Sequence, residues 1–496
     1  MKTIKNTSYR YYVAALMMMM SVTSCQEFLD INDDPNFAAQ ASNVQLMPAA
    51  QGSYVLALSS MIERASATMV QHYINGRFDN WGFNGSSYDN QWQTIYAGAL
   101  TDFAVIIDQA EANGELHYAG AAKIQKAYIY SVLVDLFGDV PFSEANGSEI
   151  NPKVDMGSEI YPQIIALIDE GITDLNGEST VALSSGDLIY GGDVADWIRM
   201  ANTLKLKMYN QMRLVNSSTA STAIDALLSE GNLISSASEN FTFRFTTSNA
   251  PEGRHPNFQA DWAAGSLENN LSSFMISKMT TSSDPRLRYY FYRQNSGSAL
   301  LGVNGGEGST PGDDNVRAIH GIYPVGGAYD DGSFLIHNET LGLQGAGIFP
   351  MITYTNRLFI EAEAALMLGT SGDPRALLQA AVNSSFSEVA GFAGVAMDAT
   401  ATSSYMTNVL TAYDAATTDE ERLAVIINEK YVAMFGNGIE SYNDYRRTGY
   451  PTGLNLPVVQ NGPYPNKFPI PPVEVTANEN IEPTTDLTAK VFWDLD

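Results

Sequence analysis

Helical periodicity runs through most of the first half of the chain. Leu100, Phe103, Ala104 and Ile107 follow the i, i+3, i+4, i+7 spacing of one helical face. Similar patterns predict further helices over residues 121–136, 162–175, 193–208, 354–368 and 421–435. Amphipathic helices paired by short turns are typical of stacked repeats of the tetratricopeptide kind. The sequence therefore predicts a mainly α fold, built on a tetratricopeptide-like helical scaffold.

The middle of the chain has a different character. Gly, Ser, Asn and Asp are dense there, as in LLGVNGGEGSTPGDDNVRAIHG at residues 300–321, and FTFRF at 241–245 predicts a short strand. Long loops in folded proteins usually carry function. We therefore divide the chain into a helical region, a loop-rich region and a region of C-terminal helices and loops, at residues 46–215, 216–350 and 351–496.

The N-terminus has the pattern of an export signal. Lys2, Lys5 and Arg10 precede an apolar run that is too short to span a bilayer. Small residues then lead to Cys25, the only cysteine, which we interpret as the lipid-modified first residue of a lipoprotein. Residues 1–24 are then a signal peptide, and residues 25–45 a lipid anchor with an acidic tether. The alternative is an ordinary secretory peptide with a chance cysteine.

The charge of the chain excludes one class of partner. Its 496 residues carry a formal net charge of -28. Such a field repels phosphate backbones, and no Lys/Arg cluster offsets it locally, so nucleic-acid binding is excluded. After the signal, no stretch of 18 unbroken apolar residues predicts a membrane span. A solvated acidic surface is the default interpretation of the charge.

Some residues with functional character are better explained as structural. Trp197 and Asn202 on a predicted helix are expected in the core. Glu361 and Glu363 point to different helical faces because they are two residues apart, so they do not converge as an acid pair. The segment 440–447 predicts an ion-pair network, because Arg446 and Arg447 lie near Asp444 and Glu440.

Six stretches taken in order resemble one family, the SusD/RagB-type nutrient-binding outer-membrane lipoproteins. They are SCQEFLDINDDPN (24–36), GGDVADWIRMANTLKLKMYNQMR (191–213), DPRLRYYF (284–291), FPMITYTNRLFIEAEAAL (349–366), IINEKYVAMFGNGIESYNDYRRTGYP (426–451) and KFPIPPVEVTANEN (467–480). The resemblance covers essentially the whole chain.

This resemblance carries expectations about fold and function. It implies a helical scaffold of four tetratricopeptide-like units with a loop-rich part that contacts ligand. It implies a partner, a TonB-dependent (SusC-like) outer-membrane transporter, over which the lipoprotein lies as a hinged lid. The implied ligand is a polysaccharide or oligosaccharide, or in some members a peptide, and no catalysis is implied. The acidic stretch after Cys25 resembles the signal that sends such lipoproteins to the cell exterior.

The strongest candidate for ligand contact is the stretch NGRFDNWGFNGSSYDNQW at 75–92. Aromatic rings can stack on the C–H faces of sugars, while amides and charged groups orient hydroxyls. Phe78, Trp81 and Phe83 alternate there with Arg77 and Asn80. If these rings are exposed together, they predict a glycan site. The alternative is a loop whose aromatic side chains pack into the scaffold.

Two further loops supply weaker candidates. Trp262 lies in EGRHPNFQADW, and Tyr323 lies in the long loop from Gly302 to Asp331. The acidic turns PGDDNV and YDDGS offer oxygen ligands for calcium, but neither has the spacing of a helix–loop–helix calcium loop. We therefore expect no cofactor and leave calcium open.

Catalytic motifs are not visible in the sequence. The five histidines are too scattered for a zinc pattern, and no GxSxG or P-loop occurs. With 55 acidic residues, the sequence does not exclude the carboxylate pair of a glycoside hydrolase. Three hypotheses remain open: ligand capture without catalysis, glycan hydrolysis, and a scaffold that closes a transporter without touching ligand. The first is favoured.

Overall fold

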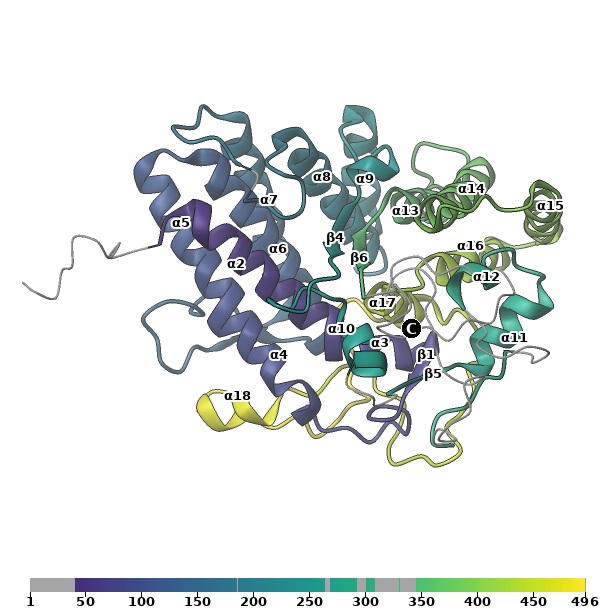
Figure 1. Ribbon diagram of the computed structural model, residues 1–496. Helices are drawn as coiled ribbons and strands as arrows, with labels where there is room; N and C mark the ends of the chain where they lie inside the picture. Colours follow the sequence, from purple (N-terminus) through teal and green to yellow (C-terminus); the bar gives the residue numbers. More distant parts are fainter. Residues whose placement is uncertain are drawn as a thin grey trace, which may run out of the picture.

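The computed structural model describes residues 41–184, 186–263, 268–291, 300–307, 330 and 345–495 (Figure 1). The predicted signal peptide, Cys25 and Tyr323 lie outside these residues, as does the side chain of Trp262. Within the described ranges, no helix combines the length and the apolar character needed to cross a membrane.

Helices dominate the N-terminal half, as predicted. They are α2 (Asn43–Ala57), α3 (Glu63–Met69), α4 (Asp89–Gln93), α5 (Thr101–Asn113), α6 (Leu116–Phe137), α7 (Gly157–Asn176), α8 (Val194–Gln211) and α9 (Ser217–Glu230). Consecutive helices from α5 to α9 pack side by side, and α2 lies against α5 (Figure 1). This stacking confirms the mainly α fold that the periodicity predicted.

Local signals in the sequence set several helix boundaries. Asp193 caps α8 by accepting hydrogen bonds from the backbone N–H groups of Ala195 and Asp196, as predicted. Asn216 caps α9 in the same way, and Gly231 ends α9 with a φ of 68°, a conformation that glycine adopts without steric cost. The residues from Leu100 to Ile107 share one helical stretch, but a π-helical turn over Thr94–Leu100 leads into α5.

A second group of helices closes the C-terminal half. It comprises α13 (Tyr354–Leu368), α14 (Pro374–Ala393), α15 (Ala399–Ala415), α16 (Asp419–Ala433), α17 (Gly438–Thr448) and α18 (Pro472–Ala477). The element α13 packs against α8 and α9 as well as α14 and α16, so it joins the two helical groups. The predicted helices at 354–368 and 421–435 are confirmed.

Short strands and helical turns fill the region between these groups. The strand β4 (Phe241–Phe245) pairs antiparallel with β6 (Gly347–Ile352), so the predicted strand at 241–245 is confirmed. Two smaller pairs join β1 (Tyr73–Asn75) to β5 (Asn269–Leu271) and β2 (Val140–Pro141) to β3 (Val154–Asp155). Short helices α10 (Pro256–Phe258), α11 (Ser273–Thr281) and α12 (Leu287–Tyr290) lie nearby.

Several buried charges in the scaffold form ion pairs. Glu363 contacts Arg447 and, at 2.7 Å, Arg213, and these guanidinium groups hold the pKa of its carboxyl well below the usual range although burial opposes them. Arg447 also pairs with Asp444 at 2.7 Å, as predicted. Arg446 instead lies over the ring of Tyr442 at 4.1 Å. These contacts fasten α17 to α13 and the end of α8.

Core positions predicted from the sequence are confirmed. Trp197 is fully buried, and its indole Nε1 donates to Asp187 at 2.8 Å. Asn202 is buried and donates to the backbone oxygen of Asn232 at 3.0 Å. Both side chains hold α8 in place.

Candidate functional site

The aromatic loop predicted to contact ligand is packed into the scaffold. The exposed fractions of residues Phe78, Trp81 and Phe83 are 0%, 7% and 8%. The Phe78 and Phe83 rings meet edge to face at 5.3 Å, and Phe83 meets Phe468 at 5.5 Å in the same way. The structure therefore shows the alternative arrangement, in which these rings have little free surface for a sugar.

The polar members of this loop also have partners within the chain. The side chain of Arg77 is 51% exposed and pairs with Glu268 at 2.9 Å. Asn80 accepts a hydrogen bond from the backbone N–H of Gly82 with its side chain, and one from Asn461 with its backbone oxygen. Trp81 has a positive φ of 63° and packs edge to face on Tyr464. These contacts hold the loop against the rest of the chain.

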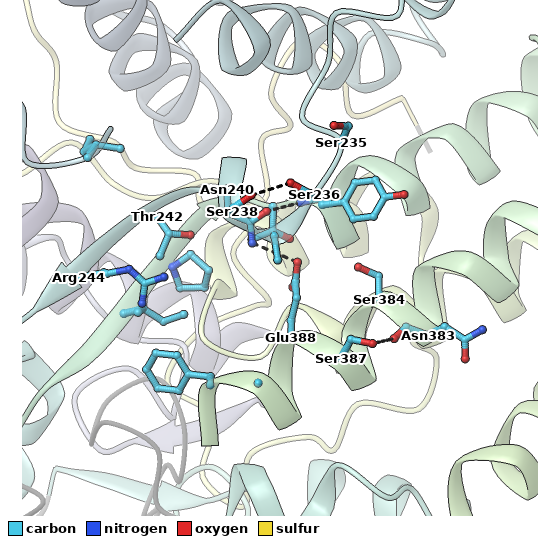
Figure 2. Close-up of a pocket in the computed structure, with 18 of the residues that line it drawn as sticks. Ser235, Ser236, Ser238, Asn240, Thr242, Arg244, Asn383, Ser384, Ser387 and Glu388 are labelled. Carbon is cyan, nitrogen blue, oxygen red and sulfur yellow. Dashed lines mark hydrogen bonds between the residues drawn. The ribbon is translucent and has the colours of Figure 1, made fainter. Parts of the chain in front are cut away.

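A large cavity lies elsewhere, between the β4–β6 pair, α14 and the segment before β4 (Figure 2). Its volume is about 780 Å³, which is in the range of small-molecule sites. Residues 235–238, Asn240 and residues 189–190 form one side, and the N-terminus of α13 contributes Thr353 and Tyr354. This cavity is the candidate functional site.

The strand wall follows from the two-residue period of a β-strand. Thr242 and Arg244 line the cavity, and their direct partners across the ladder, Pro350 and Ile348, line it too. Phe241 and Phe245 alternate with them and are buried on the opposite face of the strand pair. One face of β4–β6 therefore serves the core and the other serves the cavity.

The helical wall follows from the 3.6-residue period of α14. Its cavity-facing residues recur at i, i+3, i+4, i+7, i+8 and i+11, and are Ala380, Asn383, Ser384, Ser387, Glu388 and Gly391. The buried residues of α14, such as Leu378, Val382 and Phe386, fall on another face. Asp373 caps this helix and accepts from the backbone N–H groups of Arg375 and Ala376.

Hydroxyl and amide groups are frequent in the lining. These neutral polar groups belong to Ser235, Ser236, Ser238, Asn240, Thr242, Thr353, Asn383, Ser384 and Ser387. The rings of Tyr190, Tyr354 and Phe392 supply aromatic surface. A lining of hydroxyls and amides with a few rings matches a ligand that offers many hydroxyl groups and flat apolar faces.

One carboxyl group stands at the floor of this cavity. Figure 2 shows Glu388 directed from α14 toward Asn240, whose amide donates to it at 3.1 Å. The same Asn240 accepts from the backbone N–H of Tyr354 at 2.7 Å, which fixes the orientation of its amide. Burial raises the pKa of Glu388, and among the described residues hydrogen bonds from Asn240 and Thr355 oppose the shift.

The described residues do not supply the groups that glycoside hydrolysis or metal binding would need. Glu388 is the only carboxyl side chain among the described residues that line the cavity, whereas glycoside hydrolysis needs two. Among the described residues, no group of three His, Cys, Asp or Glu side chains is placed to hold a metal ion. Asp330 is the only described residue of the two acidic turns considered for calcium, so the calcium prediction lies outside the described residues.

The helical wall of this cavity has a recognisable pattern in the sequence, but the pattern is not specific to a binding site. The run AAVNSSFSEVAG at 380–391 carries small polar residues at helical spacing. Such a stripe usually marks a solvated helix face, so the sequence alone does not distinguish it from the rest of the surface. The hydrogen bond from Asn240, just before β4, to Glu388 on this helix is a long-range contact that the sequence pattern does not show.

The fold and the cavity together define a helical-repeat protein of the ligand-binding kind. A family model described as SusD-like, starch-binding and associating with the outer membrane matches residues 35–471. The chain therefore belongs to the SusD-like family, as its six motifs indicated. Among curated proteins, none matches the chain significantly in sequence.

Solved structures show the same fold. A chitin-binding protein is similar with a TM-score of 0.70 and 22% identity, over 92% of this chain and 100% of its own. A SusD/RagB family protein from Bacteroides thetaiotaomicron has a TM-score of 0.69 and 20% identity, over 92% and 99%. A chitin-binding SusD homologue from Flavobacterium johnsoniae has 0.69 and 18%, over 90% and 98%. At these identities the likeness establishes the fold.

Proposed function

We propose that this protein captures glycans at the cell surface and that the cavity between β4–β6 and α14 contacts the ligand. The observation that carries the proposal is the lining of the cavity, which presents neutral hydroxyl and amide groups beside aromatic rings. The family description as starch-binding and the two similar chitin-binding proteins support a glycan ligand. The protein binds its ligand without cleaving it.

The second part of the proposed function is delivery of the captured glycan to a transporter. Cys25 carries the lipid that anchors the chain in the outer membrane, and the acidic residues after it form a tether. The protein then acts as a hinged lid over a TonB-dependent (SusC-like) transporter and hands the glycan to it. The association of the family with the outer membrane supports this arrangement. Moderate affinity suits this role, because the ligand must be released to the transporter.

A substitution at Gly391 tests the site directly. Gly391 lies on the cavity wall in α14, and a Cβ added there meets no atom within 4 Å. Gly391→Phe therefore introduces a large ring into the cavity while the scaffold is retained, and Gly391→Ala is the matched control. Calorimetric titration with starch- and chitin-derived oligosaccharides is expected to show binding to the wild type and to Gly391→Ala, with at least about tenfold weaker binding to Gly391→Phe. Equal affinity in all three would exclude the cavity.

A further inference from the structure

Glu388 differs from the paired acids of the scaffold. Glu440 contacts Lys430 at 2.9 Å, and Asp284 contacts Arg286 at 2.6 Å, so their charges are balanced inside the chain. No described cation pairs with Glu63, but a single backbone N–H, that of Gly438, donates to both of its carboxyl oxygens. Among the described residues, the groups that donate hydrogen bonds to Glu388 are Asn240 and Thr355, and no described Lys, Arg or His side chain forms an ion pair with it.

Glu388 differs from the paired acids also in its position, because it lies in the wall of the cavity. Its carboxyl group lines the 780 Å³ cavity, whereas Glu440 and Asp284 are enclosed by protein. The other charged residue of the lining, Arg244, lies four residues along β4 from Asn240, which is about 13 Å in an extended strand. Because no described cation is paired with Glu388, its carboxyl group can receive a cation that a ligand brings into the cavity.

We propose that Glu388 forms an ammonium subsite in this cavity, and that the site binds saccharides carrying a free primary amine. The inference rests on the proposed function and narrows its substrate class. An ammonium group has three donors, which match the carboxylate of Glu388 and the hydroxyls of Ser384 and Ser387 on the same face of α14. The remaining hydroxyl and amide groups serve the sugar rings.

Saccharides fit the lining better than peptides do. A peptide needs partners for its backbone N–H and C=O groups, which exposed strand edges usually supply. The cavity instead presents side-chain hydroxyls from the face of β4–β6, from α14 and from residues 235–238. Side-chain hydroxyls and amides exchange hydrogen bonds with sugar hydroxyls in either direction.

Paired oligosaccharides of one length and linkage test the proposal. The purified full chain in mild detergent is titrated with a glucosamine oligomer, whose amines are protonated, and with its fully N-acetylated counterpart, which is neutral. The wild type is expected to bind the amine form about tenfold more tightly, because only that form brings an ammonium group that pairs with the carboxylate of Glu388 and offsets the cost of its burial. Glu388→Gln is expected to lose this preference while its affinity for the neutral form changes by less than about twofold.

A second variant separates the subsite from the general acidity of the protein. Glu230 is exposed at the end of α9, so Glu230→Gln removes the same charge away from the cavity. It is expected to keep the full preference for the amine form. Equal loss in Glu230→Gln and Glu388→Gln, or no loss in either, would overturn the proposal. A tetraglycine that shows Glu388-dependent binding where the oligosaccharides show none would assign the subsite to peptide instead.

The outcomes distinguish this inference from the proposed function. If the neutral oligomer binds and Gly391→Phe abolishes that binding, but the amine form has no advantage, glycan capture stands and the ammonium subsite fails. If neither oligomer binds to the wild type, and starch-derived oligosaccharides do not bind either, both proposals fail. Far-ultraviolet circular dichroism of Glu388→Gln establishes that the variant is folded.

Discussion

Asn240 and Glu388 join the two principal walls of the cavity through a hydrogen bond of 3.1 Å. Asn240 immediately precedes β4, and Glu388 lies in the last third of α14, 148 residues further along the chain. Because Asn240 is itself held by the backbone N–H of Tyr354, a single amide connects β4, α13 and α14. This contact positions the carboxyl group on which the ligand proposal depends.

Replacing Asn240 is therefore expected to affect stability and binding together. Asn240→Ala leaves Glu388 and the N–H of Tyr354 without this partner, at a cost of about 1–3 kcal/mol. The affinity for amine-bearing saccharides is expected to fall as well, since the orientation of Glu388 is no longer fixed. Denaturant unfolding and calorimetric titration of the variant measure the two effects, and normal values for both would show that the amide has no positioning role.

Replacing Trp81 is expected to act mainly on stability. The indole is 7% exposed and packs on Tyr464, so Trp81→Ala removes a buried ring at a cost of about 3–5 kcal/mol. We expect a lower denaturation midpoint and, below that midpoint, little change in glycan affinity. A stable variant with strongly weakened binding would instead place Trp81 in a ligand site, as the sequence first suggested.

The contact between α6 and α7 depends on two glycines. A Cβ at Gly171 would lie 2.9 Å from the backbone oxygen of Gly120, and a Cβ at Gly120 would lie 2.6 Å from that of Gly171. Gly171→Ala is therefore expected to destabilise the protein by about 1–3 kcal/mol, although alanine favours helices. Gly391→Ala, in open space on α14, is the control and should cost nothing. Equal stability of the two variants in thermal unfolding would contradict the close approach.

Glu63 gives the stability of the protein a pH dependence. Burial raises the pKa of its carboxyl from 4.5 to about 8. Between these values the folded state holds a proton that the unfolded state has released, so the contribution of Glu63 to stability falls as pH rises through this window. Glu63→Gln does not titrate, and its stability relative to the wild type is expected to rise by a few kcal/mol between about pH 5 and pH 8.5.

Denaturant unfolding of the two proteins across this range checks the expectation, with Glu230→Gln as the control for an exposed glutamate. A constant difference between Glu63→Gln and the wild type would mean that the carboxylate stays ionised. In that case the two hydrogen bonds from the N–H of Gly438 would outweigh the cost of burial.

The predicted lipid anchor has a direct test. Cys25→Ala removes the thiol to which lipid is attached, so the chain is expected to leave the detergent phase and the membrane fraction. Phase partitioning of both proteins measures this, and mass spectrometry of the N-terminal peptide identifies the modification. Retention of Cys25→Ala in the membrane fraction would show that another contact holds the protein there.

Much of the fold could be predicted from the sequence because its signals are local. Asp193 predicted the start of α8, the short apolar run FTFRF predicted β4, and the spacing of apolar residues predicted α13 and α16. The family resemblance added the overall architecture, which the family model and the solved structures confirm.

The candidate site could not be predicted in the same way. Aromatic residues in a Gly- and Asn-rich stretch predict exposed rings, but Phe83 and Trp81 are buried against Phe468 and Tyr464, which lie almost 400 residues later. Conversely, Asn240 and Glu388 are unremarkable in sequence and meet only in the folded chain. Burial determines the first result and a long-range contact determines the second. A local sequence pattern predicts neither of them.

Native affinity electrophoresis of the full chain in mild detergent tests the central claim most directly. The wild type and Gly391→Phe are run through gels containing starch-type or soluble chitin-type polysaccharide, and the polysaccharide is then checked for chain shortening. The account predicts that at least one polysaccharide retards the wild type, that Gly391→Phe is retarded much less, and that no chain is shortened. Equal retardation of the two proteins, shortening of the polysaccharide, or free migration of the wild type in every gel would contradict it.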